Sequence, residues 1–327
     1  MSSTIRWGLL AAGGIAETFA LALQEAEGAE LVAVGSRDQV RATNFADRFA
    51  IPHAHGSYAE LAADPDVDAV YVATPHTFHA RDTILCLEQG KHVLCEKPFA
   101  VNSEEARRMI AAARSADRLL MEAMWTRFLP SVISLREQLA AGAIGEVRLL
   151  QADFGIQPPF DAEGRLFNAE LAGGALLDLG VYAVSLGHAL FGAPSKISGS
   201  ARLGETGVDE DGAIVLDHGQ GRFTLAYQSL RVATPREAVI RGTAGEIRLP
   251  EPWWGASAFT LTRPGAEPET HSFRRRGRGY THMAEAFMGL LADGQRESAI
   301  MPHADSLDVL QTLDTLRRQW GLRYPFE

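Results

Sequence analysis

The pattern of apolar and polar positions changes near residue 125 of this 327-residue chain. Before that point, short strands that are apolar throughout alternate with helices. The expected strands are 5–11, 31–35, 68–74, 93–95 and 119–123, and the expected helices are 15–25, 80–89 and 104–113. Because strands buried on both faces are typical of parallel sheets, residues 1–125 are predicted to form an α/β domain with a doubly wound parallel sheet.

Beyond residue 125, several strands follow one another without helices between them. A helix at 130–141, a strand at 146–152 and a helix at 175–191 precede strands at 196–203, 212–217, 222–228, 236–241 and 259–262, and helices at 281–292 and 303–320 close the chain. Consecutive strands joined by turns are typical of antiparallel sheets. Residues 126–327 are therefore predicted to form an α+β domain with an open, mainly antiparallel sheet.

Composition and charge restrict the partners that the chain is expected to have. A net charge of −10 argues against nucleic acid or an anionic membrane as the main partner, since both bind basic surfaces. The two cysteines, Cys86 and Cys95, lack the spacing of metal ligands, and no metal site is expected. Residues 1–6 lack the apolar stretch of a signal peptide, and no segment is expected to span a membrane. The expectation is a cytoplasmic protein.

The turn after the first strand matches a dinucleotide-binding fingerprint. Ala11, Gly13 and Ala16 occupy its three small-residue positions, with Gly14 and Ile15 between the last two. These positions serve the tight turn, the backbone approach to a pyrophosphate and the packing of helix on strand. Alanine replaces the first glycine, and the motif alone could also be an ordinary glycine turn. Its place between a strand and a helix favours nucleotide binding.

The end of the second strand suggests which dinucleotide binds. Ser36 and Arg37 stand where an acidic residue would accept the ribose hydroxyls of NAD, and a guanidinium suits the 2′-phosphate of NADP. Asp38 leaves NAD possible, because a shift of one residue would restore an acidic partner. NADP is the predicted cofactor.

Residues with reactive or polar side chains follow three expected parallel strands at their carboxyl ends. They are Thr74, Pro75, His76 and His79 after the third strand, Glu96 and Lys97 after the fourth, and Trp125 and Arg127 after the fifth. Open α/β sheets bind ligands at this edge, so these residues are expected near the nicotinamide and the substrate. Pro98 restricts the backbone of Lys97, although a surface Lys-Pro turn remains an alternative. Each histidine could equally be structural.

The helix at 175–191 is predicted to carry a polar stripe. Asp178 and Tyr182 are four residues apart and should share a helix face with Ser185, whereas His188 falls off that face. A solvated face is the alternative. An ammonium near a phenol lowers the phenol's pKa, so Lys97 could allow Tyr182 to act as an acid/base group near neutral pH. Asp178 could orient the substrate or Lys97.

These motifs together resemble the glucose–fructose oxidoreductase / inositol dehydrogenase (Gfo/Idh/MocA) family. The likeness rests on the Ala-x-Gly-x-x-Ala turn, on Glu96-Lys97-Pro98 and on Asp178-x-Gly-x-Tyr182, and it covers essentially the whole chain. The segment 122–128 resembles the dimeric dihydrodiol dehydrogenase / NADP-dependent D-xylose 1-dehydrogenase subgroup.

The resemblance implies a Rossmann domain followed by an open-sheet domain that binds substrate and mediates oligomerisation. It implies that Lys97 lies in the active site, that Tyr182 is the general acid/base and that Asp178 contacts substrate. Trp125 and Phe154 would line the substrate pocket. It also implies a cis peptide before Pro98, and a homodimer or homotetramer formed through the exposed face of the second sheet.

The predicted function is hydride transfer between NADP and a hydroxyl or carbonyl carbon of a sugar, polyol or trans-dihydrodiol. One alternative is a reductase of ketosugars such as an anhydrofructose, or an enzyme that recycles a tightly held cofactor. Another is a dinucleotide-sensing regulatory protein without turnover. The basic run at 274–278 is expected to be a solvated loop, with capture of an anionic substrate as its alternative.

Overall fold

The computed structural model describes residues 4–327 and divides them into two compact units. The first unit consists of residues 4–128 and Arg276–Ser306, and the second of Leu129–Arg275 and Leu307–Glu327. A boundary near residue 125 was expected from the sequence. The return of Arg276–Ser306 to the first unit was not, because the sequence pattern suggested two contiguous domains.

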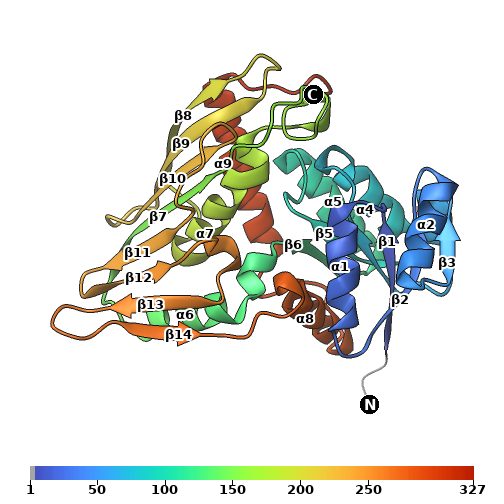
Figure 1. The fold of residues 1–327 in the computed structure, drawn as a ribbon, viewed down its shortest axis with the longest axis horizontal. Coiled ribbons are helices and arrows are strands. Elements are labelled where there is room, and N and C mark those ends of the chain that lie inside the picture. Colours follow the sequence, from blue (N-terminus) through green and yellow to red (C-terminus); the bar gives the residue numbers. More distant parts are fainter. Residues whose placement is uncertain (1–3) are drawn as a thin grey trace. The chain divides into compact units, whose positions relative to one another are not determined.

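The first unit contains a six-stranded parallel sheet in the order β3-β2-β1-β4-β5-β6 (Figure 1). Its strands are β1 (Ile5–Leu10), β2 (Ala29–Gly35), β3 (His53–His55), β4 (Ala69–Val72), β5 (His92–Glu96) and β6 (Leu120–Ala123). Its helices are α1 (Gly14–Gln24), α2 (Gln39–Phe49), α3 (Tyr58–Ala63), α4 (His79–Glu88), α5 (Ser103–Ala116) and α8 (Tyr280–Ala292). The strand order reverses between β1 and β4, which is where doubly wound sheets bind ligands. The predicted doubly wound sheet is confirmed.

Helix α8 completes the core of the first unit. The Trp7 ring of β1 packs against Phe19 of α1 at 5.3 Å between centroids and against Phe287 of α8 at 5.1 Å. The Thr281 hydroxyl also donates a hydrogen bond of 2.9 Å to the carbonyl of Ala22. The Phe287 contact and the Thr281 hydrogen bond join segments more than 250 residues apart in sequence, and local periodicity carries no information about them.

Three elements of the first unit were missed in the sequence pattern. They are α2, β3 and α3, which lie between β2 and β4. Helix α2 is largely polar and begins at the cap residue Asp38, whereas β3 has only three residues and α3 only six. Short elements with few apolar positions give a weak periodic signal.

The second unit contains an eight-stranded sheet in the order β14-β13-β12-β11-β7-β10-β9-β8. Only β7 and β10 pair in parallel, so the sheet is mainly antiparallel, as predicted. Its strands are β7 (Val147–Gly155), β8 (Lys196–Leu203), β9 (Asp209–Asp217), β10 (Phe223–Ser229), β11 (Ala238–Gly242), β12 (Gly245–Leu249), β13 (Ala258–Thr262) and β14 (Glu269–Ser272). Its helices are α6 (Pro130–Ala140), α7 (Val181–Phe191) and most of α9 (His303–Trp320). The short strands β12 and β14 were not expected.

The segment that leads into α7 differs from the single helix expected at 175–191. Residues Leu176–Gly180 form a π-helix, and α7 follows at Val181. The stretch Ala169–Phe191 also reaches the length and mean hydropathy (1.4) of a membrane span, contrary to the expectation that no segment would. However, 78% of the apolar window is buried within the protein, and a core helix meets the same criterion. We therefore interpret this segment as a core helix.

Candidate functional site

The turn between β1 and α1 has the features of a phosphate-binding loop. Gly13 is the N-cap of α1, and no side chain caps this end of the helix. A Cβ atom at Gly13 or Gly14 would meet no protein atom within 4 Å, so the protein's own packing does not require glycine here. The uncapped N–H groups and the open space suit the close approach of a dinucleotide phosphate. Ala16, the third small residue, lies in the first turn of α1 and is fully buried.

Ala11 adopts a backbone conformation that normally belongs to glycine. Its φ is +95°, although this is the position where the fingerprint usually has its first glycine. A residue with a Cβ atom in the left-handed region costs about 1–2 kcal/mol relative to glycine. The N–H of Ala11 donates to the carbonyl of Gly35 at 3.0 Å, which fixes the turn against the end of β2. The departure from the motif therefore leaves the tight turn intact.

The end of β2 is basic, and the acidic residue that follows Arg37 is already engaged. The Asp38 side chain accepts a hydrogen bond of 3.1 Å from the N–H of Arg41 and caps α2. The Arg41 guanidinium returns to the fingerprint turn, where Nε and Nη2 donate to the carbonyl of Ala12 at 3.2 and 3.1 Å. Arg37 is exposed and Ser36 is buried beside it. The sequence reasoning missed Arg41, because its approach to Ala12 depends on the undetected helix α2.

Further arginine side chains lie near the end of β2. The Arg37 and Arg81 guanidinium groups lie 5.9 and 4.7 Å from the centroid of the Phe78 ring. Burial raises the pKa of Tyr58, and the nearby charge of Arg37 is the largest influence opposing that rise. Arginines from three different segments therefore gather beside Tyr58, which suits a phosphate better than a pair of hydroxyls.

The carboxyl end of β4 contains the expected histidines. His76 and His79 are both buried, and Thr74 is buried with its hydroxyl unpartnered among the described residues. The two ring nitrogens of His79 lie 2.8 Å from the carbonyl oxygen of Pro98 and 2.9 Å from that of Thr74. Both nitrogens are thus used to join the ends of β4 and β5. This favours the structural role that the sequence left open for His79.

Glu96 lies buried at the end of β5, directly before Lys97. Its carboxyl accepts hydrogen bonds from the Tyr71 hydroxyl and, at 3.0 Å, from the backbone N–H of Lys97. Burial raises the pKa of Glu96 to about 7, and the charge of Lys97 opposes this rise. The Lys97–Pro98 peptide is cis, as the family resemblance implied. Glu96 is therefore placed to hold the backbone of Lys97 in position.

A second buried carboxyl, Glu122, stands at the end of β6. It accepts a hydrogen bond of 3.2 Å from the N–H of Phe99, just after the cis proline. Burial raises the pKa of Glu122, and the charges of Arg127 and Lys97 oppose the rise. Sequence reasoning assigned no role to Glu122, although a glutamate inside an apolar strand was a visible signal.

The segment after β6 holds the two predicted substrate residues of the first unit. The buried Trp125 ring stacks on Tyr280 of α8 at 5.1 Å between centroids. Arg127 is also buried, and its guanidinium pairs with Asp305 and donates to the carbonyl of Ile300. These contacts favour a structural role for Arg127 over the substrate-binding role expected from the sequence.

In the second unit, Asp178 is held by an arginine that the sequence did not single out. Arg165 donates to both carboxylate oxygens of Asp178, at 2.8 and 3.2 Å. The Asp178 side chain is 13% exposed and the Arg165 side chain 48%. A bidentate pair of this kind fixes the carboxylate plane. Arg165 lies in a loop without regular secondary structure, and only the folded chain reveals its partner.

Tyr182 lies in an aromatic cluster. The Phe154 ring is 5.7 Å from Tyr182 and stacks directly on Trp254, whose ring is 6.2 Å from Tyr182. Phe154 was expected from the family resemblance, whereas Trp254 was missed. The doublet Trp253-Trp254, which the structure places in a short 3-10 helix (Trp253–Gly255), was the available signal, since tryptophan often serves binding. The cluster gives the phenol an apolar, planar wall.

The helix that carries Asp178 is fixed at its beginning by buried polar groups. The Asp209 carboxylate accepts a hydrogen bond of 2.7 Å from the N–H of Leu176, and burial raises its pKa to about 7. The Tyr324 hydroxyl, from the C-terminal tail, donates to the carbonyl of Gly173 at 3.0 Å. Both contacts hold the turn that precedes the π-helix.

The basic run at 274–278 has partners inside the protein. The Arg275 guanidinium donates to the carbonyl of Gly255, and Arg276 pairs with Glu285. Arg274 and Arg278 are exposed. This arrangement favours the solvated loop over capture of an anionic substrate.

The matches to known families follow the two units. Residues 5–124 match the model of an oxidoreductase family with an NAD-binding Rossmann fold, and residues 132–248 match the GFO/IDH/MocA C-terminal domain. The chain belongs to the GFO/IDH/MocA family of oxidoreductases. This confirms the family that the three motifs suggested.

Relatives and solved structures extend the match to the full chain. The trans-1,2-dihydrobenzene-1,2-diol dehydrogenases of Xenopus laevis and Homo sapiens are each 38% identical, over 98% of this chain and 99% and 98% of theirs. KijD10, a 3-ketoreductase from Actinomadura kijaniata solved with NADP and TDP-benzene, has a TM-score of 0.86 and 28% identity over 97% of this chain and 98% of its own. The aldose-aldose oxidoreductase of Caulobacter crescentus shares the fold, with a TM-score of 0.86 at 22% identity over 96% of this chain and 97% of its own.

Proposed function

We propose that the protein is an NADP-dependent oxidoreductase that transfers a hydride between NADP and a hydroxyl or carbonyl carbon of a sugar, polyol or trans-dihydrodiol. The observation that carries the proposal is the uncapped Gly13–Gly14 turn with the guanidinium of Arg41 bound to it. The dehydrogenase names of the full-length relatives support the substrate class, and the 3-ketoreductase with NADP supports the cofactor.

Backbone groups would hold the pyrophosphate, and basic side chains would hold the 2′-phosphate. The N–H groups at Gly14, Ile15 and Ala16 are the uncapped donors of α1. Arg37 and Arg41 would bind the 2′-phosphate, since Asp38 is engaged as the cap of α2. Thr74, Pro75 and His76 follow β4 at the edge where such sheets bind the rest of a dinucleotide. When bound, the nicotinamide ring accepts or supplies the hydride.

Side chains of the protein would transfer the proton of the substrate hydroxyl. We assign Tyr182 as the group that takes the substrate hydroxyl proton in oxidation and returns it in reduction, with Phe154 and Trp254 excluding water beside the phenol. Lys97 is assigned as the cation that stabilises the phenolate form. Asp178, with its plane fixed by Arg165, would accept a hydrogen bond from a second substrate hydroxyl. Trp125 is retained as a proposed substrate contact.

The cofactor assignment is tested with a double substitution. Arg37→Ala with Arg41→Ala removes two charged donors worth about 1.5–3 kcal/mol each, so NADP should bind at least about 100-fold more weakly. Binding of NAD should change little. The control is Arg48→Ala, which removes an exposed α2 arginine paired with Glu17. Equal losses for NADP and NAD, or none for either, would contradict the assignment.

The catalytic assignment is tested with Tyr182→Phe and Lys97→Met. Loss of general acid/base catalysis should lower kcat by about 10²–10⁴ while the Tyr182 variant still binds NADP. Tyr227→Phe, at a half-buried tyrosine on β10, is the matched control. Turnover should be measured in both directions with trans-dihydrodiols, sugars and ketosugars. Binding of NADP without turnover of any of these compounds would favour the alternative of a dinucleotide-sensing regulatory protein.

We also propose a homodimer or homotetramer formed through the second sheet. Val215 of β9 pairs with Leu225 of β10, and these two side chains are 41% and 36% exposed, with Phe223 at 38%. Such an apolar patch suits burial against a second copy. Light scattering should then give twice or four times the chain mass, and Val215→Glu with Leu225→Glu should give monomers. A cytoplasmic location is part of the proposal, since Cys86 and Cys95 are both free.

A further inference from the structure

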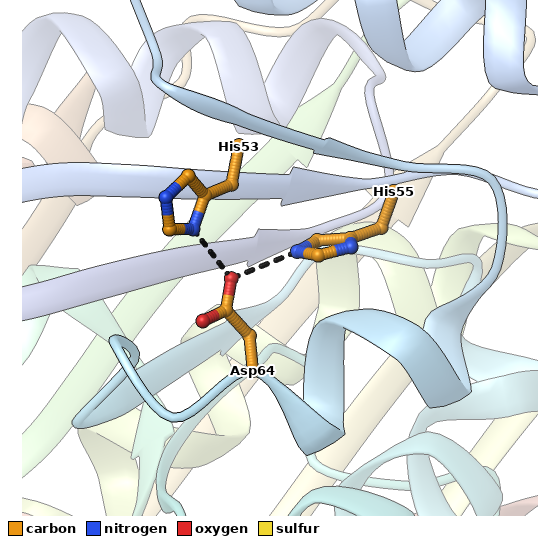
Figure 2. Close-up of side chains that lie close together, drawn as sticks. All are labelled: His53, His55 and Asp64. Atoms are coloured by element: carbon orange, nitrogen blue, oxygen red, sulfur yellow. Dashed lines mark hydrogen bonds and ion pairs between the residues drawn. The ribbon is translucent and has the colours of Figure 1, made fainter.

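Two histidines and one aspartate converge on the edge of the first sheet. His53 and His55 lie on β3, the edge strand, and Asp64 is the C-cap of α3 (Figure 2). The Oδ2 atom of Asp64 is 2.7 Å from His53 Nδ1 and 2.8 Å from His55 Nε2. Each of the three side chains offers one possible metal-ligand atom, and these three atoms lie within 4.8 Å of one another. Among residues 4–327, this is the group of histidine, cysteine, aspartate or glutamate side chains that meets this criterion.

Local structure explains the convergence. Residues two apart on a strand point to the same side, so the alternation His-Ala-His turns both rings toward α3. The second carboxylate oxygen of Asp64 accepts the N–H of Asp66 at 2.9 Å, which leaves Oδ2 for the histidines. Lys91 Nζ donates to the carbonyls of Asp64 and Val67 and holds this turn in place. The three donors are therefore positioned by the fold.

The exposure of the three side chains also suits a cation. Asp64 is the most buried of them. Its side chain is 4% exposed, whereas those of His53 and His55 are 36% and 23% exposed, so an ion can reach the rings from solvent.

We propose that His53 Nδ1, His55 Nε2 and Asp64 Oδ2 form a binding site for one divalent transition-metal ion, of which Zn²⁺ is the chosen probe. Tetrahedral Zn²⁺ with bonds of about 2.0–2.1 Å separates its donors by about 3.3 Å, so each ring nitrogen must move about 0.5–0.6 Å away from Asp64 Oδ2 to admit the ion. Two imidazoles with one carboxylate suit zinc, copper or nickel better than magnesium or calcium. The fourth position is open to water.

Asp66 can accept a hydrogen bond from His53 when that histidine binds metal. A neutral histidine that binds metal through Nδ1 carries its proton on Nε2. The Nε2 atom of His53 is 4.0 Å from Asp66 Oδ2, close enough for a small ring movement to form the carboxylate–histidine contact that usually supports a metal ligand. This site was not expected from the sequence, because β3 and α3, which bring the three residues together, were not detected.

The site adjoins the residues proposed to bind the cofactor's 2′-phosphate. The N–H of Ser36 donates to the carbonyl of His55 at 3.1 Å, so β3 borders the end of β2. A bound ion would join β3 to α3 and stiffen this edge. The metal proposal does not depend on the proposed activity, since its test measures ion binding directly.

The first test titrates chelator-treated full-length protein with ZnCl₂ by calorimetry. One Zn²⁺ per chain is expected, and His53→Gln with His55→Gln should weaken binding by at least about 100-fold. Glutamine keeps a neutral donor toward Asp64, and circular dichroism checks the fold. His271→Gln, on β14, is the matched control and should bind as the parent does. Asp66→Asn should weaken binding about tenfold.

A second measurement does not depend on the variants folding. X-ray absorption of the zinc-loaded parent should show two imidazole nitrogens and oxygen ligands at about 2.0–2.1 Å. Absence of saturable binding, a zinc shell without imidazole, or unchanged affinity in the folded double variant would indicate an adventitious ion only and would overturn the proposal.

Discussion

Replacing Glu96 by glutamine should change how the stability of the first unit depends on pH. Glu96 is buried under Lys97 with a pKa raised by burial to about 7, whereas an unfolded glutamate has the ordinary value of 4.5. Below pH 4.5 both states hold the proton. Between pH 4.5 and 7 only the native state does, so native stability falls as the pH rises through this window. Above it, both states are ionised and the loss is complete.

The difference between the two pKa values corresponds to about 3 kcal/mol of stability lost between pH 4.5 and 8. Glu96→Gln cannot ionise, and its amide can still accept from Lys97 and donate to the Tyr71 oxygen. The variant should therefore gain about 3 kcal/mol relative to the parent over this range.

Urea unfolding at several pH values compares the stability of the parent with that of Glu96→Gln. Hydrogen exchange of the β5 amides gives the same comparison for the first unit alone. Glu267→Gln, at an exposed glutamate in a loop, is the control and should follow the parent. Parallel pH curves for the parent and Glu96→Gln would refute the reasoning, because they would mean that Glu96 ionises in the native protein as readily as in the unfolded chain.

Three further substitutions test other features. Ala11→Gly should stabilise the protein by about 0.5–1 kcal/mol in urea unfolding, because relief of the positive φ outweighs the unfolded-state entropy that glycine adds; a loss of stability would contradict the strain. Tyr324→Phe should cost about 1–2 kcal/mol by leaving the Gly173 carbonyl unpaired, and calorimetry showing no change would argue against that bond. Trp254→Ala should raise the substrate KM about tenfold or more with NADP affinity unchanged, and Trp254→Phe should recover most of the loss.

Much of the fold could be predicted because its central strands carry strong local signals. The strands β1, β4, β5 and β6 are largely apolar and mostly buried, a pattern that is typical of parallel sheets covered on both faces. What the sequence missed depends on distant contacts. The helix at 281–292 was predicted, but its place in the first unit, where Phe287 contacts Trp7, was not; strand β3, which depends on pairing with β2, was not detected.

The residues of the candidate site likewise divide into those with a local sequence signal and those that depend on distant contacts. Gly13, Lys97 and Tyr182 could be selected from motifs, since each follows a strand or shares a helix with another polar residue. Arg41 and Arg165 could not, because the first depends on an undetected polar helix and the second on a loop whose path has no periodic signal. Glu96 was selected for cofactor binding, whereas the hydrogen bonds that it accepts from Tyr71 and from the Lys97 N–H favour a role in supporting the lysine.

The path of the chain limits how this protein can be taken apart or recombined. The backbone passes between the two units after residues 128, 275 and 306, and the last of these points lies inside helix α9. A fragment ending at residue 128 would lose Phe287 and leave Trp7 without one of its ring partners. A chimera that exchanges the second sheet with a relative therefore needs an insert replacing Leu129–Arg275 together with a matching C-terminal piece, rather than a single junction.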